Sequence, residues 1–227
     1  MLGSEIYPVL KNLGATDLYH ANSVATSCTF LEQGGLLSRE YAESNGLKQT
    51  PQKSDQEDKK FGIWDRIFLD HVDIHARGGR KQAPNHYGPV LFQLDLDILL
   101  QLPEGADILV TKYNPMYWKD NESDSDHWFR NLEELAKSIH LGDFQKMLVI
   151  QTPTGQLDFP NRRTRVILDD PRRQTSSGED AYEYAQRQLA EAAEVGKVEV
   201  SISQRACQDG CVCLEQYKHR DVDPWFS

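Results

Sequence analysis

A histidine and several polar side chains follow a short apolar strand near the start of the chain. Tyr19 and His20 end the apolar triplet that begins at Leu18, and Asn22 and Ser23 come almost directly after it. The next residues favour a helix, so backbone N–H groups and an imidazole could lie together beside a phosphate or a ribose. The pattern predicts a ligand-binding entrance, and ordinary packing of the Tyr-His pair is the structural alternative.

Two arginines offer the forked donors that suit a pyrophosphate. Arg66 lies in the stretch GIWDRIF, and Arg39 follows the Gly34-Gly35 pair closely. A planar guanidinium makes two charge-assisted hydrogen bonds to phosphate oxygens, which the point charge of a lysine cannot reproduce. We place Arg66 first and keep Arg39 as its rival. The alternative for Arg66 is an ion pair with a neighbouring aspartate.

The residues from Leu18 to Leu37 resemble the opening of ADP-ribosyltransferases, especially the DarT-type enzymes that modify nucleic-acid bases. The matching features are the LYH triplet, the polar residues after it and the helix that ends at a Gly-Gly-Leu turn. The resemblance implies an α+β fold with an ADP-ribosyltransferase-like mixed β-sheet core and flanking helices. It implies NAD as the substrate, with no metal required.

The same resemblance assigns roles to individual residues. Tyr19, His20 and Asn22 would orient NAD, while Arg66 or Arg39 would bind its phosphates. ADP-ribose would pass to a macromolecular acceptor, with a DNA or RNA base as the leading candidate and protein modification or NAD hydrolysis as variants. A toxin or phage-defence role, with an antitoxin protein as a partner, would follow by analogy.

Aromatic side chains in two segments could stack on a nicotinamide or a nucleobase. Tyr87 stands just before a Gly-Pro pair, and residues 112–118 (KYNPMYW) contain three aromatics after a predicted strand. Stacking requires exposed rings, whereas clustered aromatics are usually buried in a core. We therefore keep Tyr87 as a ligand contact and treat residues 112–118 first as packing.

The glutamate that ADP-ribosyltransferases carry near the start of a late strand has no counterpart in the strand predicted at Met147–Ile150. Gln145 precedes that strand, Gln151 follows it, and Asp158 lies one turn later. A glutamine forms hydrogen bonds but cannot supply negative charge to an oxocarbenium-like ribose. Gln145 and Gln151 remain candidate catalytic positions. The chain is then a divergent enzyme, an inactive nucleotide- or partner-binding relative, or one in which glutamine replaces glutamate.

Two further groups have side chains that bind metals. His71, Asp73 and His75 alternate, so a strand would project all three from one face, which offers a metal-dependent hydrolase as the rival enzyme. Hydrogen-bonded polar residues are the commoner outcome for such a triple. The tail holds Cys207, Cys211 and Cys213 with His219, but the C-x3-C-x-C spacing is unusual for zinc, and reduced, partly buried thiols are favoured.

Length and charge limit the possible classes of protein. The 227 residues, 39% of them hydrophobic, predict one domain over residues 1–227. A formal charge of −10 disfavours indiscriminate binding to nucleic acid or anionic membranes, although local basic clusters remain at residues 77–81 and 162–173. The start of the chain lacks a basic segment followed by a long apolar run, so we expect a cytoplasmic protein without a membrane partner.

Short strands outnumber the regular helix-strand alternation of a doubly wound fold, and no phosphate-binding glycine fingerprint occurs. Residues 45–60 are polar without apolar periodicity, which predicts a mobile loop beside the cleft. A Cys-containing tail covers about residues 204–227. The predicted helices are 24–33, 38–42, 128–139 and 180–194, the last stopped by Gly196, and the predicted strands are 87–96, 108–111, 147–150, 165–168 and 197–203.

Overall fold

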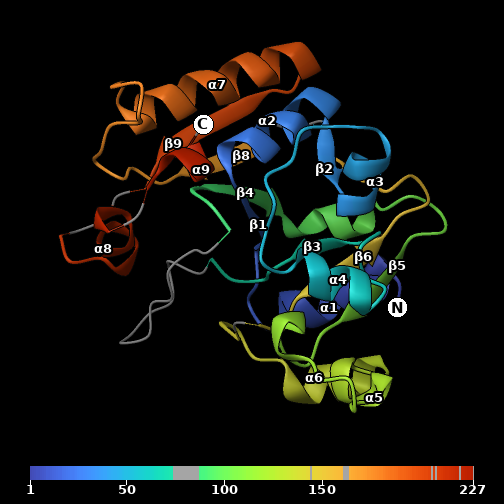
Figure 1. The fold of residues 1–227 in the computed structure, drawn as a ribbon. Helices are drawn as coiled ribbons and strands as arrows, with labels where there is room; N and C mark the ends of the chain where they lie inside the picture. Colours follow the sequence, from blue (N-terminus) through green and yellow to red (C-terminus); the bar gives the residue numbers. More distant parts are fainter. Residues whose placement is uncertain are drawn as a thin grey trace.

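The computed structural model describes residues 1–73, 87–143, 145–160, 164–205, 207, 209–219 and 221–226. Helices and strands are interspersed along the chain, and the strands form mixed sheets flanked by helices (Figure 1). The α+β class predicted from the sequence is confirmed.

The larger sheet has the strand order β1-β4-β8-β9. Its strands are β1 (Asp17–Asn22), β4 (Val90–Asp95), β8 (Thr164–Leu168) and β9 (Val200–Gln204). The pairings of β1 with β4 and of β4 with β8 are antiparallel, whereas β9 runs parallel to β8. The parallel pair is joined through the long helix α7 (Ala181–Gly196), because a parallel connection needs a crossover.

A second sheet has the order β3-β6-β5 and is antiparallel throughout. Its strands are β3 (Ile67–Leu69), β6 (Leu148–Gln151) and β5 (Asp107–Val110). One backbone bridge joins it to the larger sheet: the Tyr19 and Asp70 peptides exchange hydrogen bonds of 2.7 and 2.8 Å. Beyond this bridge β1 and β3 are no longer paired as strands, so the two sheets part along His20 to Asn22.

Helices cover the two sheets at opposite ends of the molecule (Figure 1). Helix α7 packs on α2 (Val24–Gln33), and α9 (Asp223–Phe226) contacts both. Gly196 permits this close approach, because a Cβ there would lie 1.9 Å from the Leu31 carbonyl oxygen. The remaining elements are α1 (Gly3–Asn12), β2 (Gly35–Leu37), α3 (Arg39–Ser44), α4 (Asp55–Lys60), η1 (Leu96–Leu100), η2 (Pro115–Tyr117), α5 (Asp124–His127), α6 (Leu132–Ser138), β7 (Gln156–Asp158) and α8 (Val212–Lys218).

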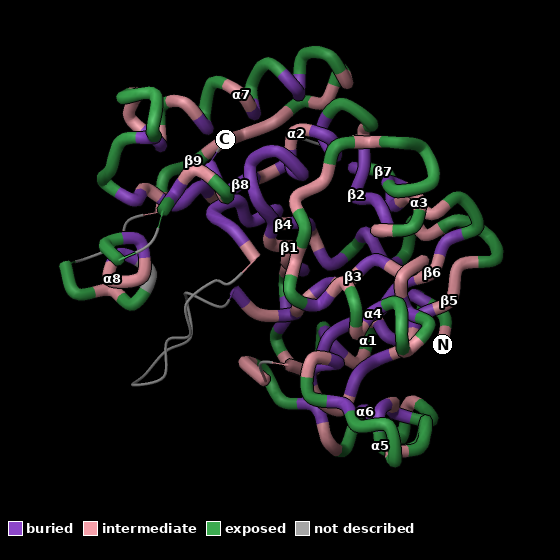
Figure 2. The backbone as a smooth tube through the Cα atoms, in the orientation of Figure 1, coloured by how far each residue is buried: buried purple, intermediate pink, exposed green. Residues whose placement is uncertain are grey.

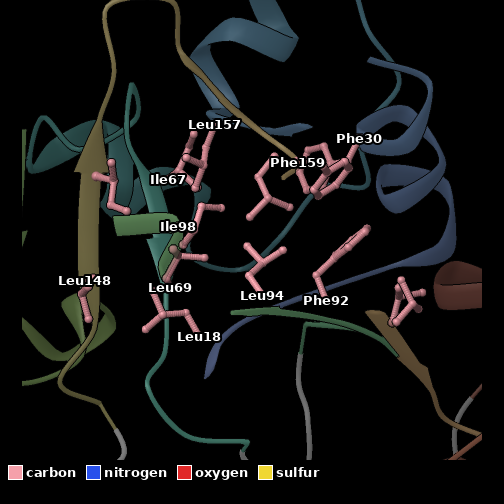
Figure 3. Packing of buried hydrophobic residues seen from close by; sticks show 14 of the residues in the cluster. Leu18, Phe30, Ile67, Leu69, Phe92, Leu94, Ile98, Leu148, Leu157 and Phe159 are labelled. Atoms are coloured by element: carbon pink, nitrogen blue, oxygen red, sulfur yellow. The ribbon is translucent and has the colours of Figure 1, made fainter. Parts of the chain in front are cut away.

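One cluster of buried apolar side chains runs through both sheets. Figure 2 shows the buried residues concentrated along the central strands. Figure 3 shows Leu18 and Leu94 of the larger sheet in the same packed cluster as Leu69 of the smaller sheet. Phe92 stacks on Phe159, with ring centroids 5.3 Å apart and planes 22° apart. This shared core fixes the angle at which β1 and β3 diverge.

Several predicted elements differ from those observed. Residues 45–60 include helix α4, whose Ser54 and Asp58 are buried, so this segment is not a loop without structure. Helix α7 extends past the predicted Glu194 and ends at Gly196, and the left-handed residue that follows it is Lys197 (φ 56°) and not a glycine. The helix predicted at 128–139 is confined to α6, because Trp128 pairs with Thr111 in a β-bridge.

Candidate functional site

A pocket opens where β1 and β3 separate. It has about 80 Å³ of room for water-sized molecules, within about 710 Å³ of space that includes open solvent. Its wall is built from β1, α2, β3 and the segments around Arg39, Ser54 and Asn114. The pocket therefore collects side chains from parts of the chain that are far apart in sequence. Such convergence is typical of a ligand site.

Five of the residues singled out from the sequence line this pocket together: His20, Asn22, Arg39, Arg66 and Tyr87. They come from four separate stretches of the chain. The geometry is thus consistent with the prediction that these residues belong to one site. Arg66 and Arg39, which the sequence offered as alternatives, both line the pocket.

The His20 side chain forms a hydrogen bond between β1 and β3 at the point where the two strands separate. Its Nδ1 lies 2.8 Å from the carbonyl oxygen of Phe68 on β3. Its Nε2 lies 3.3 Å from Nδ2 of Asn22. Because a carbonyl can only accept, Nδ1 carries the proton and donates it, and Nε2 is left as an acceptor.

The Asn22 amide supports the same tautomer. Its Oδ1 accepts hydrogen bonds from the Ser23 backbone N–H (2.9 Å) and from Nε2 of Gln52 (3.1 Å). These two donors turn the Asn22 NH₂ group toward His20. Removal of the ring from water, together with the nearby Arg39 cation, lowers the pKa of His20 to about 4. The imidazole is therefore neutral at physiological pH, and the single lone pair of Nε2 faces the Asn22 amide.

Arg39 is held at the pocket wall by the segment that follows it. Its Nη2 donates to both carboxylate oxygens of Asp55 at 2.7 Å and to the Thr50 carbonyl at 3.1 Å. The buried Nε and Nη1 atoms have no hydrogen-bond partner. A buried N–H without an acceptor is costly, so Arg39 retains donors that a bound anion would satisfy.

Arg66 is positioned by the second sheet. Its Nη2 donates to Oε1 of Gln151 at 3.1 Å, and its Nη1 lies 3.7 Å from a carboxylate oxygen of Asp107. Gln151 in turn donates to Asp65 through its Nε2. Gln151 thus orients Arg66 from behind and is not itself part of the pocket wall described by the structure. Nη1 of Arg66 is buried and makes no hydrogen bond.

Tyr87 enters the pocket because the next residue is a glycine. Gly88 has φ 139°, and a Cβ on it would lie 2.3 Å from the Asn22 carbonyl oxygen, so only glycine lets the chain pass this close to β1. Burial raises the pKa of the Tyr87 phenol, against a hydrogen bond with Asn114 that lowers it. The phenol is neutral and lies among polar neighbours of the pocket.

Two carboxylates of the pocket were not singled out in the sequence: Asp58 on α4 and Asp70 at the end of β3. Asp58 is 7% exposed, and this burial raises its pKa to about 7, with the negative charge of Asp55 acting in the same direction. The sequence did contain a signal for the helix that carries Asp58. The run SDQEDKK has a serine and acidic residues at its start and lysines at its end, as a short helix does.

Comparison with solved structures finds similarity to DarT from Thermus sp. 2.9. The complex with ADP-ribosylated ssDNA is 12% identical, with a TM-score of 0.47, over 84% of this chain and 95% of that one. The complex with carba-NAD⁺ is 13% identical, with a TM-score of 0.44, over 83% of this chain and 96% of that one. No protein-family model matches the chain, and no curated protein matches it in sequence.

Three of the predicted site residues lie outside the pocket wall described by the structure: Tyr19, Gln145 and Gln151. Successive side chains of a strand alternate between its faces, so Tyr19 points away from the face that carries His20. Burial, reinforced by the Asp17 charge, raises the pKa of Tyr19 to about 12. Gln145 occupies a left-handed turn (φ 85°), where its carbonyl accepts a hydrogen bond from the Thr111 hydroxyl.

Strands β6 and β8 have no carboxylate at their start, whereas Glu199 directly precedes β9. Strand β6 begins at Leu148, and β8 begins with Thr164 and Arg165. Asp158 lies on β7, where it is exposed and accepts a hydrogen bond from Gln156. The pocket carboxylates described by the structure therefore come from other segments, Asp58 and Asp70.

The histidine-aspartate triple is divided among different contacts. Both ring nitrogens of His71 face backbone carbonyls, at 3.2 and 3.3 Å, while Asp73 forms a two-pronged ion pair with Arg205. His75 lies outside the described residues, as does the side chain of Cys213. Within the part of the chain that the structure describes, no group of three or more His, Cys, Asp or Glu side chains could hold a metal ion.

The basic and aromatic residues that could contact nucleic acid differ in whether they are exposed or already paired within the fold. Arg165 pairs with Asp17 and Asp95, and Arg172 pairs with Asp209, so these cations are engaged within the fold; the clusters at 77–81 and 162–163 lie outside the described residues. In the segment 112–118, Trp118 is buried and stacks on His127 at 4.0 Å, whereas Tyr117 is 63% exposed. None of the described helices is both long and apolar enough to span a membrane.

Proposed function

We propose that this protein transfers ADP-ribose from NAD to a nucleic-acid base. The observation that carries the proposal is the convergence of His20, Arg39 and Arg66 on one pocket. These residues were assigned to NAD through the resemblance of separate sequence segments to ADP-ribosyltransferases. Their meeting in a single cavity supports that assignment, because unrelated polar residues would have no reason to gather there.

The pocket offers two kinds of contact to a dinucleotide. When NAD binds, a ribose hydroxyl would replace the Asn22 amide as the donor to the neutral His20 Nε2, which a phosphate oxygen cannot do because it only accepts. Arg39 and Arg66 each retain a buried donor without a partner, and such donors suit the pyrophosphate. In this proposal Arg66 also stabilises charge during the reaction, with Gln151 holding it in place.

The acceptor would approach from the side of η2. Asn114 and Pro115 line the pocket, and the neighbouring Tyr117 is exposed. An exposed aromatic ring at the edge of a pocket can stack on an unpaired base. With a net charge of −10, the chain would hold a single strand mainly by stacking and base contacts, so we expect only a shallow dependence of binding on salt.

The test is nicotinamide release from NAD with single-stranded DNA, RNA, protein or no acceptor. We expect release that depends on a nucleic acid and transfer of the label from NAD to that acceptor. His20→Ala and Arg66→Ala should each reduce the rate by about 100-fold or more, since they remove ribose and phosphate contacts. Arg130→Ala is the matched control, because Arg130 is an exposed arginine paired only with Glu134.

An inactive nucleotide-binding protein is the second candidate. The observation that favours it is the absence of a carboxylate from the start of β6 and β8. It predicts that NAD binds without nicotinamide release under any acceptor condition. Gln151→Glu and Gln145→Glu would then restore turnover only if one of these positions were the lost acid.

The biological role that we propose is that of a toxin or a defence factor restrained by an antitoxin partner. Modification of nucleic-acid bases blocks their copying, so expression of the active chain should arrest growth. His20→Ala should relieve the arrest at equal protein level. Equal arrest by both chains would contradict this role without affecting the biochemical proposal.

A further inference from the structure

Asp58 combines burial with a position inside the pocket. It belongs to α4, which begins directly after the buried Ser54 and is separated from Arg39 by the rest of α3 and residues 45–54. Its backbone is fixed at both ends, because its N–H donates to the Ser54 carbonyl (2.8 Å) and its carbonyl accepts from the Ile63 N–H (2.9 Å). The carboxylate is thus held by a rigid helical turn instead of a loop.

We infer that Asp58 is the catalytic base of this site. This inference rests on the proposed transferase function. As the bond between the ribose carbon and the nicotinamide nitrogen breaks, its electron pair leaves with nicotinamide. The acceptor nitrogen or oxygen forms a bond to the same carbon, and the proton that it sheds moves to the Asp58 carboxylate. Asp58 would then replace the late-strand glutamate in function although it comes from a different part of the fold.

The other carboxylates near the pocket are less suited to this step. Asp55 is engaged by Arg39 through both of its oxygens. Asp70 also lines the pocket, beside the bridge that joins β1 to β3, and it is the rival that the experiment below tests. Asp158 is exposed on β7 and lies away from the pocket wall. Asp58 has neither an arginine bound to its oxygens nor a place in the sheet.

The surroundings of Asp58 suit proton transfer near neutrality. The charged groups that act on it are Arg39 from α3 and Asp55 and Glu57 from its own helix, with Ser54 as a hydrogen-bond partner. Its own charge reaches the phenol of Tyr87 across the pocket. Burial outweighs the stabilising influence of Arg39 and Ser54 and brings the pKa to about 7. A base is most effective when its pKa lies close to the working pH.

The experiment compares Asp58→Asn with Glu57→Gln across pH 5 to 9. Asparagine keeps the shape of the side chain but cannot accept the proton, so the rate of ADP-ribose transfer should fall by about 10²- to 10⁴-fold. NAD affinity should stay within a few-fold of the parent. The acidic limb of the parent pH profile should disappear in the residual activity of Asp58→Asn. Glu57→Gln, on the adjacent position of the same helix, should keep the parent rate and profile.

Two further variants keep the test decisive. Asp58→Glu retains a carboxylate and should recover part of the rate together with the acidic limb, which a purely structural role would not predict. Parent-like transfer and pH dependence in Asp58→Asn, or a loss found only in Asp70→Asn, would overturn the inference while the transferase function stands. Silence of the parent chain with every acceptor would instead overturn the proposed function, and this inference with it.

Discussion

Two neighbouring segments contribute to the pocket in opposite ways. Residues 18–39 have an apolar pattern that specifies a strand and a helix, and both form as predicted. Residues 45–60 are mostly polar, with Leu47 packed against the core, and they supply Gln52, Ser54 and Asp58 to the pocket wall. The difference teaches that order in a mostly polar segment depends largely on partners for its hydrogen-bonding groups.

The contacts between the two segments show how this order arises. The Thr50 hydroxyl lies 2.6 Å from the Ser23 hydroxyl, and the Thr50 N–H donates to the Thr26 hydroxyl at 2.8 Å. Thr29 donates to the Lys48 carbonyl at 2.6 Å. The hydroxyl groups of Ser23, Thr26 and Thr29 therefore hold residues 48–50 against α2 through hydrogen bonds. Burying a polar group costs little free energy when it has a hydrogen-bond partner and much more when it has none.

Replacing Asp58 should give the largest effect on stability, and its sign depends on pH. The folded-state pKa of about 7 lies above the ordinary 3.8, so the folded protein binds more protons between these values and becomes less stable as pH rises through them. The total loss is up to roughly 4 kcal/mol. Asp58→Asn should therefore be more stable than the parent at pH 8 and no more stable at pH 4. Urea denaturation at both pH values measures this, and equal differences at the two would contradict it.

Arg39→Lys tests the link between the two segments. A lysine cannot reproduce the bonds to Asp55 and to the Thr50 carbonyl, so we expect a loss of about 2 kcal/mol. The matched control is Arg187→Lys, whose pairing with Glu179 is more exposed and should change stability by less than about 0.5 kcal/mol. Similar losses in both variants would show that the Arg39 contacts do not anchor residues 45–60.

Ser23→Ala should have the smallest effect and separates capping from docking. Ser23 caps α2 through the Thr26 N–H and also meets Thr50, whereas Ser38 caps α3 through the Tyr41 N–H. Each alanine should cost about 1 kcal/mol as a lost cap. Ser23→Ala should cost more than Ser38→Ala by the energy of the Thr50 contact. In a Thr50→Val background that excess should vanish. Thermal denaturation of both alanine variants with and without Thr50→Val, and of Thr50→Val alone, checks it.

The sequence predicted the strands and helices that bury an apolar face, because alternation and helical periodicity report burial directly. Strand β1, helix α2 and most of α7 are of this kind. It also selected His20, Arg39 and Arg66, whose chemistry suits a pyrophosphate-containing ligand. Helix α4 was missed because its run of residues has no apolar periodicity, although its serine and its order of acids and lysines are typical of a short helix.

The same limit explains why some predicted site residues lie outside the pocket wall. Tyr19 and His20 are adjacent, but the pleat of a strand sends adjacent side chains to opposite faces, and of these two His20 lines the pocket. Gln151, a predicted catalytic position, accepts a hydrogen bond from Arg66 and does not line the pocket. Asp58 was hidden in a run of charges, because a buried acid and a solvated one are identical in sequence.

The hydrogen bond from the His20 side chain to the Phe68 carbonyl links β1 of the larger sheet to β3 of the smaller one. A substitution at this position would remove that hydrogen bond where the two strands separate. A mutational scan scored only by cellular abundance should therefore find position 20 sensitive to substitution even without any ligand.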